Sequence, residues 1–137
     1  MIYMLDTNTL IYLIKHRPAS VAERVDRLAP DDSLCMSFIT YAELLKGAER
    51  STRPEEVRRQ LAALVRQVPV RYQADAALCA HYARHATRLK EAGTPIGGND
   101  LWIACHALAL SCVLVTNNLR EFQRIDALAL ENWADAG

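Results

Sequence analysis

Long apolar runs and closely paired cysteines are missing from this sequence of 137 residues. No apolar segment reaches the ~18 residues that a membrane-spanning helix needs, and no basic stretch leads into an apolar signal region at the start. The four cysteines include no C-x-x-C pair, and three of them lie in apolar runs, where a reduced cysteine behaves as a small hydrophobic residue. We therefore expect a soluble protein of the reducing cytoplasm that does not contact membranes.

Two common catalytic motifs are absent as well. The sequence has no G-x-S-x-G, and Cys105 and His106 fall in an apolar segment that should be buried, which argues against serine or cysteine nucleophiles. Gly93, Gly97 and Gly98 do not follow a strand and so do not form a dinucleotide-binding fingerprint. We expect these glycines to form a loop instead.

An excess of either charge is also absent, because 16 basic residues balance 16 acidic ones. This balance argues against a strongly basic nucleic-acid-binding protein. The distribution is uneven, since residues 44–99 hold ten basic and five acidic side chains and the remainder holds six and eleven. Two interpretations remain open, namely solvated helix faces or a basic flank that attracts an anionic substrate toward an acidic site.

Short apolar segments rich in β-forming residues alternate with longer segments of helical spacing. The segments predicted as strands are 2–5, 34–39, 68–70 and 113–115. This alternation indicates an α/β fold in which helices cover both faces of a parallel sheet. Because no linker, repeat or low-complexity tract is present, we expect one domain spanning residues 1–137.

The helical segments carry recognisable start and stop signals. Predicted helices cover 7–14, 20–28, 54–65, 74–91, 101–110 and 119–122. Ser20 and Glu23 have the spacing of a capping box, and Pro54 suits the first turn of its helix. Gly93 suits the C-terminal cap of the segment that ends at residue 91.

Acidic and amide side chains follow the predicted strands. Asp6 comes directly after the first strand, Glu43 four residues after the second, and Asn118 three residues after the strand at 113–115. Asp100 opens the apolar helix that leads into that strand, and Glu121 lies one helical turn beyond Asn118. Since ligands of open parallel sheets bind beyond the carboxyl ends of the strands, all five side chains can face one site.

Each of these residues also has a structural explanation. Asp6 or Asp100 could cap the helix it starts, and the pairs Thr40–Glu43 and Asn118–Glu121 have capping-box spacing. Together, however, they would place several carboxylates at one edge with no basic partner nearby in sequence. Such a cluster repels itself unless a cation lies within it.

The composition of this cluster indicates which cation would bind. Oxygen ligands without histidine or cysteine favour Mg²⁺, for which Mn²⁺ can substitute. We expect Asp6 and Asp100 to be direct ligands and Glu43 to orient ligands or the attacking water. Asn118 and Glu121 would position a second metal or further waters. This arrangement suits hydrolysis of phosphodiester bonds.

Four motifs together resemble one known family. They are M-x-x-x-L-D-T-N at the start, S-x-x-T-x-x-E-L-x-x-G around Glu43, P-I-G-x-N-D ending at Asp100, and L-V-T-N-N-x-x-E-F from residue 114. This pattern is similar to that of the PIN-domain ribonucleases and, more narrowly, of the VapC toxins of bacterial toxin–antitoxin pairs. The resemblance covers essentially the whole chain.

The resemblance implies a fold, partners and a substrate. It implies a PIN-like α/β/α sandwich, a homodimer, and inhibition by a VapB-type antitoxin whose C-terminal segment lies in the acidic groove. It implies cleavage of structured RNA, with the anticodon stem-loop of initiator tRNA as a plausible target, and operator binding through the antitoxin. Asp6, Glu43 and Asp100 would form the acidic triad, and Glu121 matches an acid of the same branch. Asn118 departs from the pattern, because many relatives carry aspartate there.

Three alternatives compete with this interpretation. A phosphatase of the haloacid-dehalogenase type would use Asp6 as a nucleophile, but Asn8 stands where its second acid is needed. A non-catalytic domain that binds RNA or a protein partner would use the acids only as helix caps. His81 and His85 have metal-ligand spacing on a predicted helix but lack a third ligand, which argues against zinc.

Overall fold

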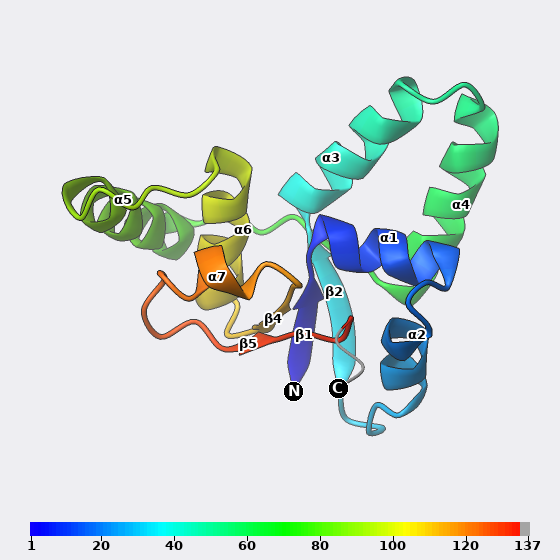
Figure 1. The fold of residues 1–137 in the computed structure, drawn as a ribbon, viewed down its shortest axis with the longest axis horizontal. Helices are drawn as coiled ribbons and strands as arrows, with labels where there is room; N and C mark the ends of the chain where they lie inside the picture. The colour runs from blue at the N-terminus through cyan, green and yellow to red at the C-terminus, as the bar shows by residue number, and fades with distance from the viewer. Residues whose placement is uncertain (135–137) are drawn as a thin grey trace.

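The computed structural model describes residues 1–134 and forms a parallel sheet with helices on both faces (Figure 1). The five strands lie in the order β3-β2-β1-β4-β5, and every neighbouring pair is parallel. In chain order the elements are β1 (Ile2–Leu5), α1 (Thr7–Lys15), α2 (Ala19–Asp26), β2 (Ser33–Ser37), α3 (Phe38–Glu49), α4 (Pro54–Gln67), β3 (Val70–Arg71), α5 (Ala76–Glu91), α6 (Gly98–Ala109), β4 (Val113–Val115), α7 (Leu119–Phe122) and β5 (Leu130–Glu131). The expected α/β architecture is confirmed.

The strand β1 divides the core into two layers because its side chains alternate between the faces of the sheet. Tyr3 and Leu5 join a cluster on the side of α1, α2 and α4, which includes Leu10 and Leu64. Met4 joins the opposite cluster beneath α5 and α6. Burial on both faces explains why the predicted strands at the centre of the sheet consist almost entirely of apolar residues.

Several boundaries differ from the sequence prediction. The strand β2 ends at Ser37 rather than at residue 39, because the Ser37 hydroxyl accepts a hydrogen bond from the Ile39 amide (3.2 Å) and caps α3. The predicted capping box from Thr40 to Glu43 is therefore wrong, since both residues lie inside the helix. The strand β3 starts at Val70, two residues later than predicted. The cause is that Val68 is the C-cap of α4 and is fully buried.

Other helix ends show which capping signals were reliable. Pro54 is the first residue of α4, and Gly93, with a φ of 70°, follows the last turn of α5 as predicted. The predicted Ser20–Glu23 capping box is wrong, because α2 starts at Ala19 and makes no side-chain cap. The helix α6 begins three residues earlier than predicted, which places Asp100 inside its first turn.

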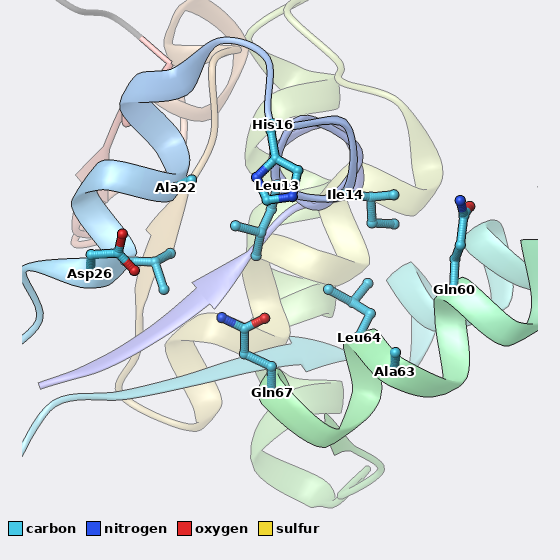
Figure 2. Close-up of a pocket in the computed structure, with 10 residues that line it drawn as sticks. Leu13, Ile14, His16, Ala22, Asp26, Gln60, Ala63, Leu64 and Gln67 are labelled. Carbon is cyan, nitrogen blue, oxygen red and sulfur yellow. The ribbon is translucent and has the colours of Figure 1, made fainter.

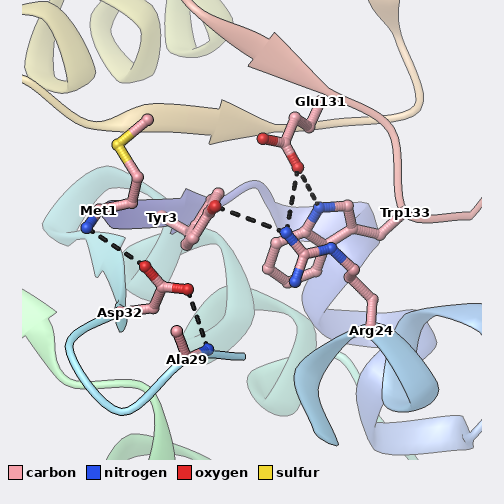
Figure 3. A network of polar contacts seen from close by, with 7 residues as sticks. All are labelled: Met1, Tyr3, Arg24, Ala29, Asp32, Glu131 and Trp133. Carbon is pink, nitrogen blue, oxygen red and sulfur yellow. Dashed lines mark hydrogen bonds and ion pairs between the residues drawn. The ribbon is translucent and has the colours of Figure 1, made fainter. Parts of the chain in front are cut away.

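The strand β5 was not predicted, and a cluster of side chains ties it to the rest of the fold (Figure 3). The Arg24 guanidinium of α2 lies 5.5 Å from the Tyr3 ring centre and 5.0 Å from that of Trp133. The Trp133 indole donates to the Glu131 carboxylate (2.9 Å), which also pairs with Arg24 (3.7 Å). These contacts hold the end of the described chain against α2 and β1.

Within residues 1–134, no helix is long and apolar enough to cross a membrane.

Candidate acidic active site

The first acidic residue, Asp6, is fixed where β1 ends. Its backbone amide donates to the Val115 carbonyl of β4 (3.0 Å), so the residue stays part of the sheet edge. Its carboxylate accepts a hydrogen bond from the Thr9 amide (2.9 Å) and caps α1. Only 7% of the residue is exposed, and this burial raises the pKa of the carboxyl group above its usual range, although hydrogen bonds from Thr116 and Thr9 oppose the shift. Asp6 is thus both a helix cap and a candidate ligand.

Glu43 reaches the same place from the middle of α3. The Thr7 hydroxyl donates to its Oε1 at 2.6 Å, and the Asn99 side-chain amide donates to its Oε2 at 3.4 Å. The donors come from the first turns of α1 and α6, which are far apart in sequence. Both oxygens of Glu43 are therefore engaged by neutral donors.

Asp100 is the acid of the site whose pKa is raised most strongly. Its pKa is raised to about 6, chiefly by burial and then by the charges of Glu43, Asp6 and Glu121, in that order of importance. Within the described chain, no hydrogen bond or ion pair engages its side chain. Its position in the first turn of α6 provides only the partial positive charge of a helix start. Both oxygens of Asp100 therefore remain available to a ligand.

Asn118 and Glu121 interact with each other instead of forming the predicted capping box. The Asn118 side-chain amide donates to the Glu121 carboxylate at 3.0 Å, and the Asn118 backbone amide donates to the Thr116 hydroxyl at 2.9 Å. The side chain of Asn118 makes no capping hydrogen bond to α7. Because its nitrogen is committed to Glu121, its amide oxygen is left for other partners.

A cavity of about 160 Å³ brings these residues together. Its lining consists of Asp6, Thr7, Asn8, Glu43, Asp100, Asn118 and Phe122. Glu121 does not line it, but the effect of its charge on the pKa of Asp100 indicates that it is close by. Four of the five predicted site residues thus share one cavity, and the fifth, Glu121, accepts a hydrogen bond from Asn118.

The donor set of this cavity fits a hard divalent cation. The cavity lining offers carboxylate, hydroxyl and amide oxygens and no histidine or cysteine, and none of the predicted acids forms a salt bridge within the described residues. In residues 1–134, no three histidine, cysteine or acidic side chains converge tightly enough to enclose a metal by themselves. A metal ion bound here would therefore take a large share of its ligands from water or substrate.

Two further cavities are larger but carry a different chemistry. One of about 400 Å³ lies between α1, α2 and α4, where Leu13, Ile14 and Leu64 point into it and Asp26 is its single acid (Figure 2). Another of about 270 Å³ shares Thr7 and Glu43 with the acidic cavity and continues along α1, α3 and α4 over mostly apolar side chains. Each of these two cavities holds one carboxylate, whereas the acidic cavity gathers three, so the acidic cavity is the candidate site despite its smaller volume.

The sequence interpretation missed three polar neighbours of the acids, namely Thr7, Asn99 and Thr116. Each is itself a residue of a quoted motif, but no spacing rule indicates where a hydroxyl or amide will point. The motifs set aside as catalytic are not assembled into a site. Cys105 and His106 are fully buried, and the rings of His81 and His85 stack on each other with centroids 6.4 Å apart and no third ligand among the described residues.

Comparison with known proteins relates this geometry to a family. The PIN domain family matches residues 3–128. The chain is 55% identical to Ribonuclease VapC1 of Haemophilus influenzae (strain R2866), over 97% of this chain and 98% of the relative. It is 39% identical to the tRNA(fMet)-specific endonuclease VapC of Shigella flexneri, over 96% of this chain and 98% of that protein.

A solved structure agrees with these similarities. The fold superposes on a chain of the VapBC-1 structure from nontypeable Haemophilus influenzae with a TM-score of 0.92 and 54% identity, covering 98% of this chain and 100% of that one. PIN-domain ribonucleases depend in general on metal ions. These similarities exclude the alternative of a haloacid-dehalogenase-type phosphatase. The matching motifs, the sheet order and the extent of identity together show that this chain belongs to the PIN-domain family and, within it, to the VapC ribonucleases.

Proposed function

We propose that this chain is a Mg²⁺-dependent endoribonuclease that acts as the toxin of a toxin–antitoxin pair. The observation that carries the proposal is the convergence of three carboxylates, from the residue after β1, from α3 and from α6, on one cavity without a basic partner among the described residues. Such a cluster is unfavourable by itself and becomes favourable when a cation binds. We also propose that residues 1–137 form a single PIN domain.

The hydrogen bonds support a division of roles among the acids. Asp100 keeps both oxygens free and Asp6 faces the same cavity, so these residues would hold Mg²⁺, with Mn²⁺ as a substitute. When bound, the ion would activate an attacking water and offset the charge that builds on the phosphate. Glu43, held through both oxygens by neutral donors, would accept a hydrogen bond from that water and orient it. Asn118, held by Glu121, would present its amide oxygen to waters or to a second ion.

Two basic side chains share a face of α3 with Glu43. Lys46 and Arg50 follow Glu43 along α3 at spacings of three and seven residues, so all three share one helix face. Both basic side chains are exposed, and neither forms a salt bridge within residues 1–134. They would attract the phosphate backbone of RNA toward an otherwise acidic site.

The names of the relatives support proposals for the substrate and the antitoxin partner. Because one relative is named a tRNA(fMet)-specific endonuclease, we propose initiator tRNA, cut in its anticodon stem-loop, as the substrate. Because a solved relative is a VapBC pair, we propose that a VapB-type antitoxin inhibits this chain and carries the assembled complex to operator DNA. The free toxin would be a cytoplasmic homodimer.

Two matched substrates test this proposal. Purified protein is incubated in Mg²⁺ with initiator tRNA and, separately, with elongator methionine tRNA. The elongator accepts the same amino acid but has a different anticodon stem-loop. We expect one cut in the initiator stem-loop and little cleavage of the elongator. Equal cleavage of both would contradict the substrate, and cleavage of neither would favour the non-catalytic alternative.

A further inference from the structure

Glu43 is the one acid of the triad that no helix start holds in place. It lies in the middle of α3, and a glutamate side chain has several rotatable bonds whose ordering costs roughly 1.5–2 kcal/mol. Asp6 and Asp100, by contrast, are short side chains at the starts of α1 and α6. Glu43 therefore needs contacts outside its own helix to keep one position.

Thr7 supplies the shorter of these contacts. Its hydroxyl donates to Oε1 of Glu43 at 2.6 Å across 36 residues of sequence, in a partly buried setting. This hydroxyl is not needed to start α1, because Asp6 already caps that helix through the Thr9 amide. A hydrogen bond to an ionised acceptor is stronger than one between neutral groups. The Thr7 hydroxyl thus serves Glu43 rather than its own helix.

Asn99 supplies a second, longer contact from the opposite side of the carboxylate. Its amide nitrogen lies 3.4 Å from Oε2 of Glu43, near the limit of a hydrogen bond. The helix to which Asn99 belongs has no side-chain cap, and Asn99 makes none. The two donors hold the carboxylate between the first turns of α1 and α6.

The charges around Glu43 would otherwise move it away. Asp6 and Asp100 repel it, and no lysine or arginine pairs with it among the described residues. We infer that Thr7, assisted by Asn99, is a positioning residue that holds Glu43 in the acidic cavity for the proposed hydrolysis. The inference deepens the proposed function and rests on it for its catalytic meaning. It adds a hydroxyl group to a site otherwise defined by acids and amides.

Matched substitutions at Thr7 separate the hydroxyl from the side-chain shape. Thr7→Val keeps the shape and removes the donor, whereas Thr7→Ser keeps the donor and removes the methyl group. We expect Thr7→Val to lower kcat for RNA cleavage by about 10–100-fold, the usual effect of losing a partner that orients an active group. Thr7→Ser should recover most of that loss. Thr87→Val, which removes an exposed hydroxyl bonded within α5, is the control.

Further readouts distinguish positioning from a general structural defect. In Thr7→Val the KM for RNA should stay close to wild type, and Mg²⁺ should still raise the melting temperature, because Asp6 and Asp100 are intact. Asn99→Ala should lower kcat less than Thr7→Val, since its hydrogen bond is longer. Equal loss in Thr7→Ser and Thr7→Val, or a loss confined to KM, would overturn the inference.

A cycle of unfolding measurements tests the contact without any activity. Thr7→Val, Glu43→Ala and the double variant are unfolded by urea in EDTA. We expect the double variant to lose less stability than the two single losses added together, because both remove the same hydrogen bond. Additive losses would overturn the inference. If the wild-type chain cuts no RNA, the proposed function fails and this cycle alone decides whether Thr7 holds Glu43.

Discussion

The side-chain amide of Asn118 donates a 3.0 Å hydrogen bond to the carboxylate of Glu121, one turn further along the chain. This contact gives a role to an amide at a position where many members of the family carry aspartate. The nitrogen neutralises part of the charge of Glu121, and the oxygen remains for the cavity. Replacing Asn118 by aspartate would remove the donor and set two carboxylates against each other.

The first prediction concerns this pair. We expect Asn118→Asp to lower the RNA cleavage rate about tenfold, which corresponds to roughly 1.4 kcal/mol of lost transition-state stabilisation. Glu121→Gln added to that variant should recover activity, because the glutamine amide can donate to the new carboxylate. Cleavage rates of the two single variants and the double variant give the coupling. Additive effects would show that the two side chains act independently.

The second prediction concerns pH and follows from Asp100. Its pKa in the folded protein is raised from 3.8 to about 6, so the folded state binds the proton more tightly than the unfolded state. Without metal, the free energy of unfolding should therefore fall as pH rises from about 4 to about 6, and then level off with respect to this group. Thermal unfolding in EDTA across this range measures the effect.

The same titration governs metal binding. Because Mg²⁺ competes with the proton on Asp100, the rise in melting temperature on adding Mg²⁺ should be small at pH 5 and larger at pH 7. Melting curves with Mg²⁺ or EDTA at each pH give the difference. A metal effect of equal size at both values would argue that Asp100 is not a ligand.

The third prediction concerns a variant that lacks the charge of Asp100. Asp100→Asn should stabilise the metal-free protein by about 1–2 kcal/mol, less than the full pKa shift implies because solvent screens a partly exposed carboxylate. The variant should also lose most of the stabilisation by Mg²⁺ and the RNA cleavage. Asp31→Asn, at an exposed position outside the cavity, is the matched control and should change neither. Urea unfolding with and without Mg²⁺ measures both effects, and a less stable metal-free Asp100→Asn would be the opposing result.

The fourth prediction concerns the aromatic cluster at Arg24. Arg24→Ala should lower the free energy of unfolding by about 1–2 kcal/mol, because the guanidinium contacts two rings and a carboxylate. None of these residues lines the acidic cavity, so kcat should stay unchanged. Arg27→Ala, an exposed arginine one turn further along, serves as the control. A large fall in kcat for Arg24→Ala would link this cluster to the site.

The sequence predicted the centre of the fold better than its edge. The strands β1 and β4 have the predicted bounds, because burial on both faces requires an apolar run that stops where the polar rim begins. The strand β5 has only two residues, Leu130 and Glu131, which is too short for any periodic signal. Its place depends on pairing with β4 and on Trp133, which are tertiary contacts.

The candidate site was predictable in its residues but not in its hydrogen bonds. The position of Asp6 after an apolar strand was enough to raise the question of its charge, and the topology then brings Glu43 and Asp100 to the same edge. The capping explanation and the ligand explanation proved compatible for Asp6. The donors Thr7 and Asn99 escaped notice because the direction of a short polar side chain depends on how distant helices pack.

One measurement tests the central claim most directly. Bulk tRNA is incubated with the wild-type protein or with Asp6→Asn, in Mg²⁺ or in EDTA, and the fragments are separated on a denaturing gel. Asparagine caps helices as well as aspartate does, so the variant should remain folded while losing the charge. We expect discrete fragments only with the wild-type protein in Mg²⁺. Fragments of equal yield with Asp6→Asn or in EDTA would contradict the account, because the acidic cavity would then not be the catalytic site.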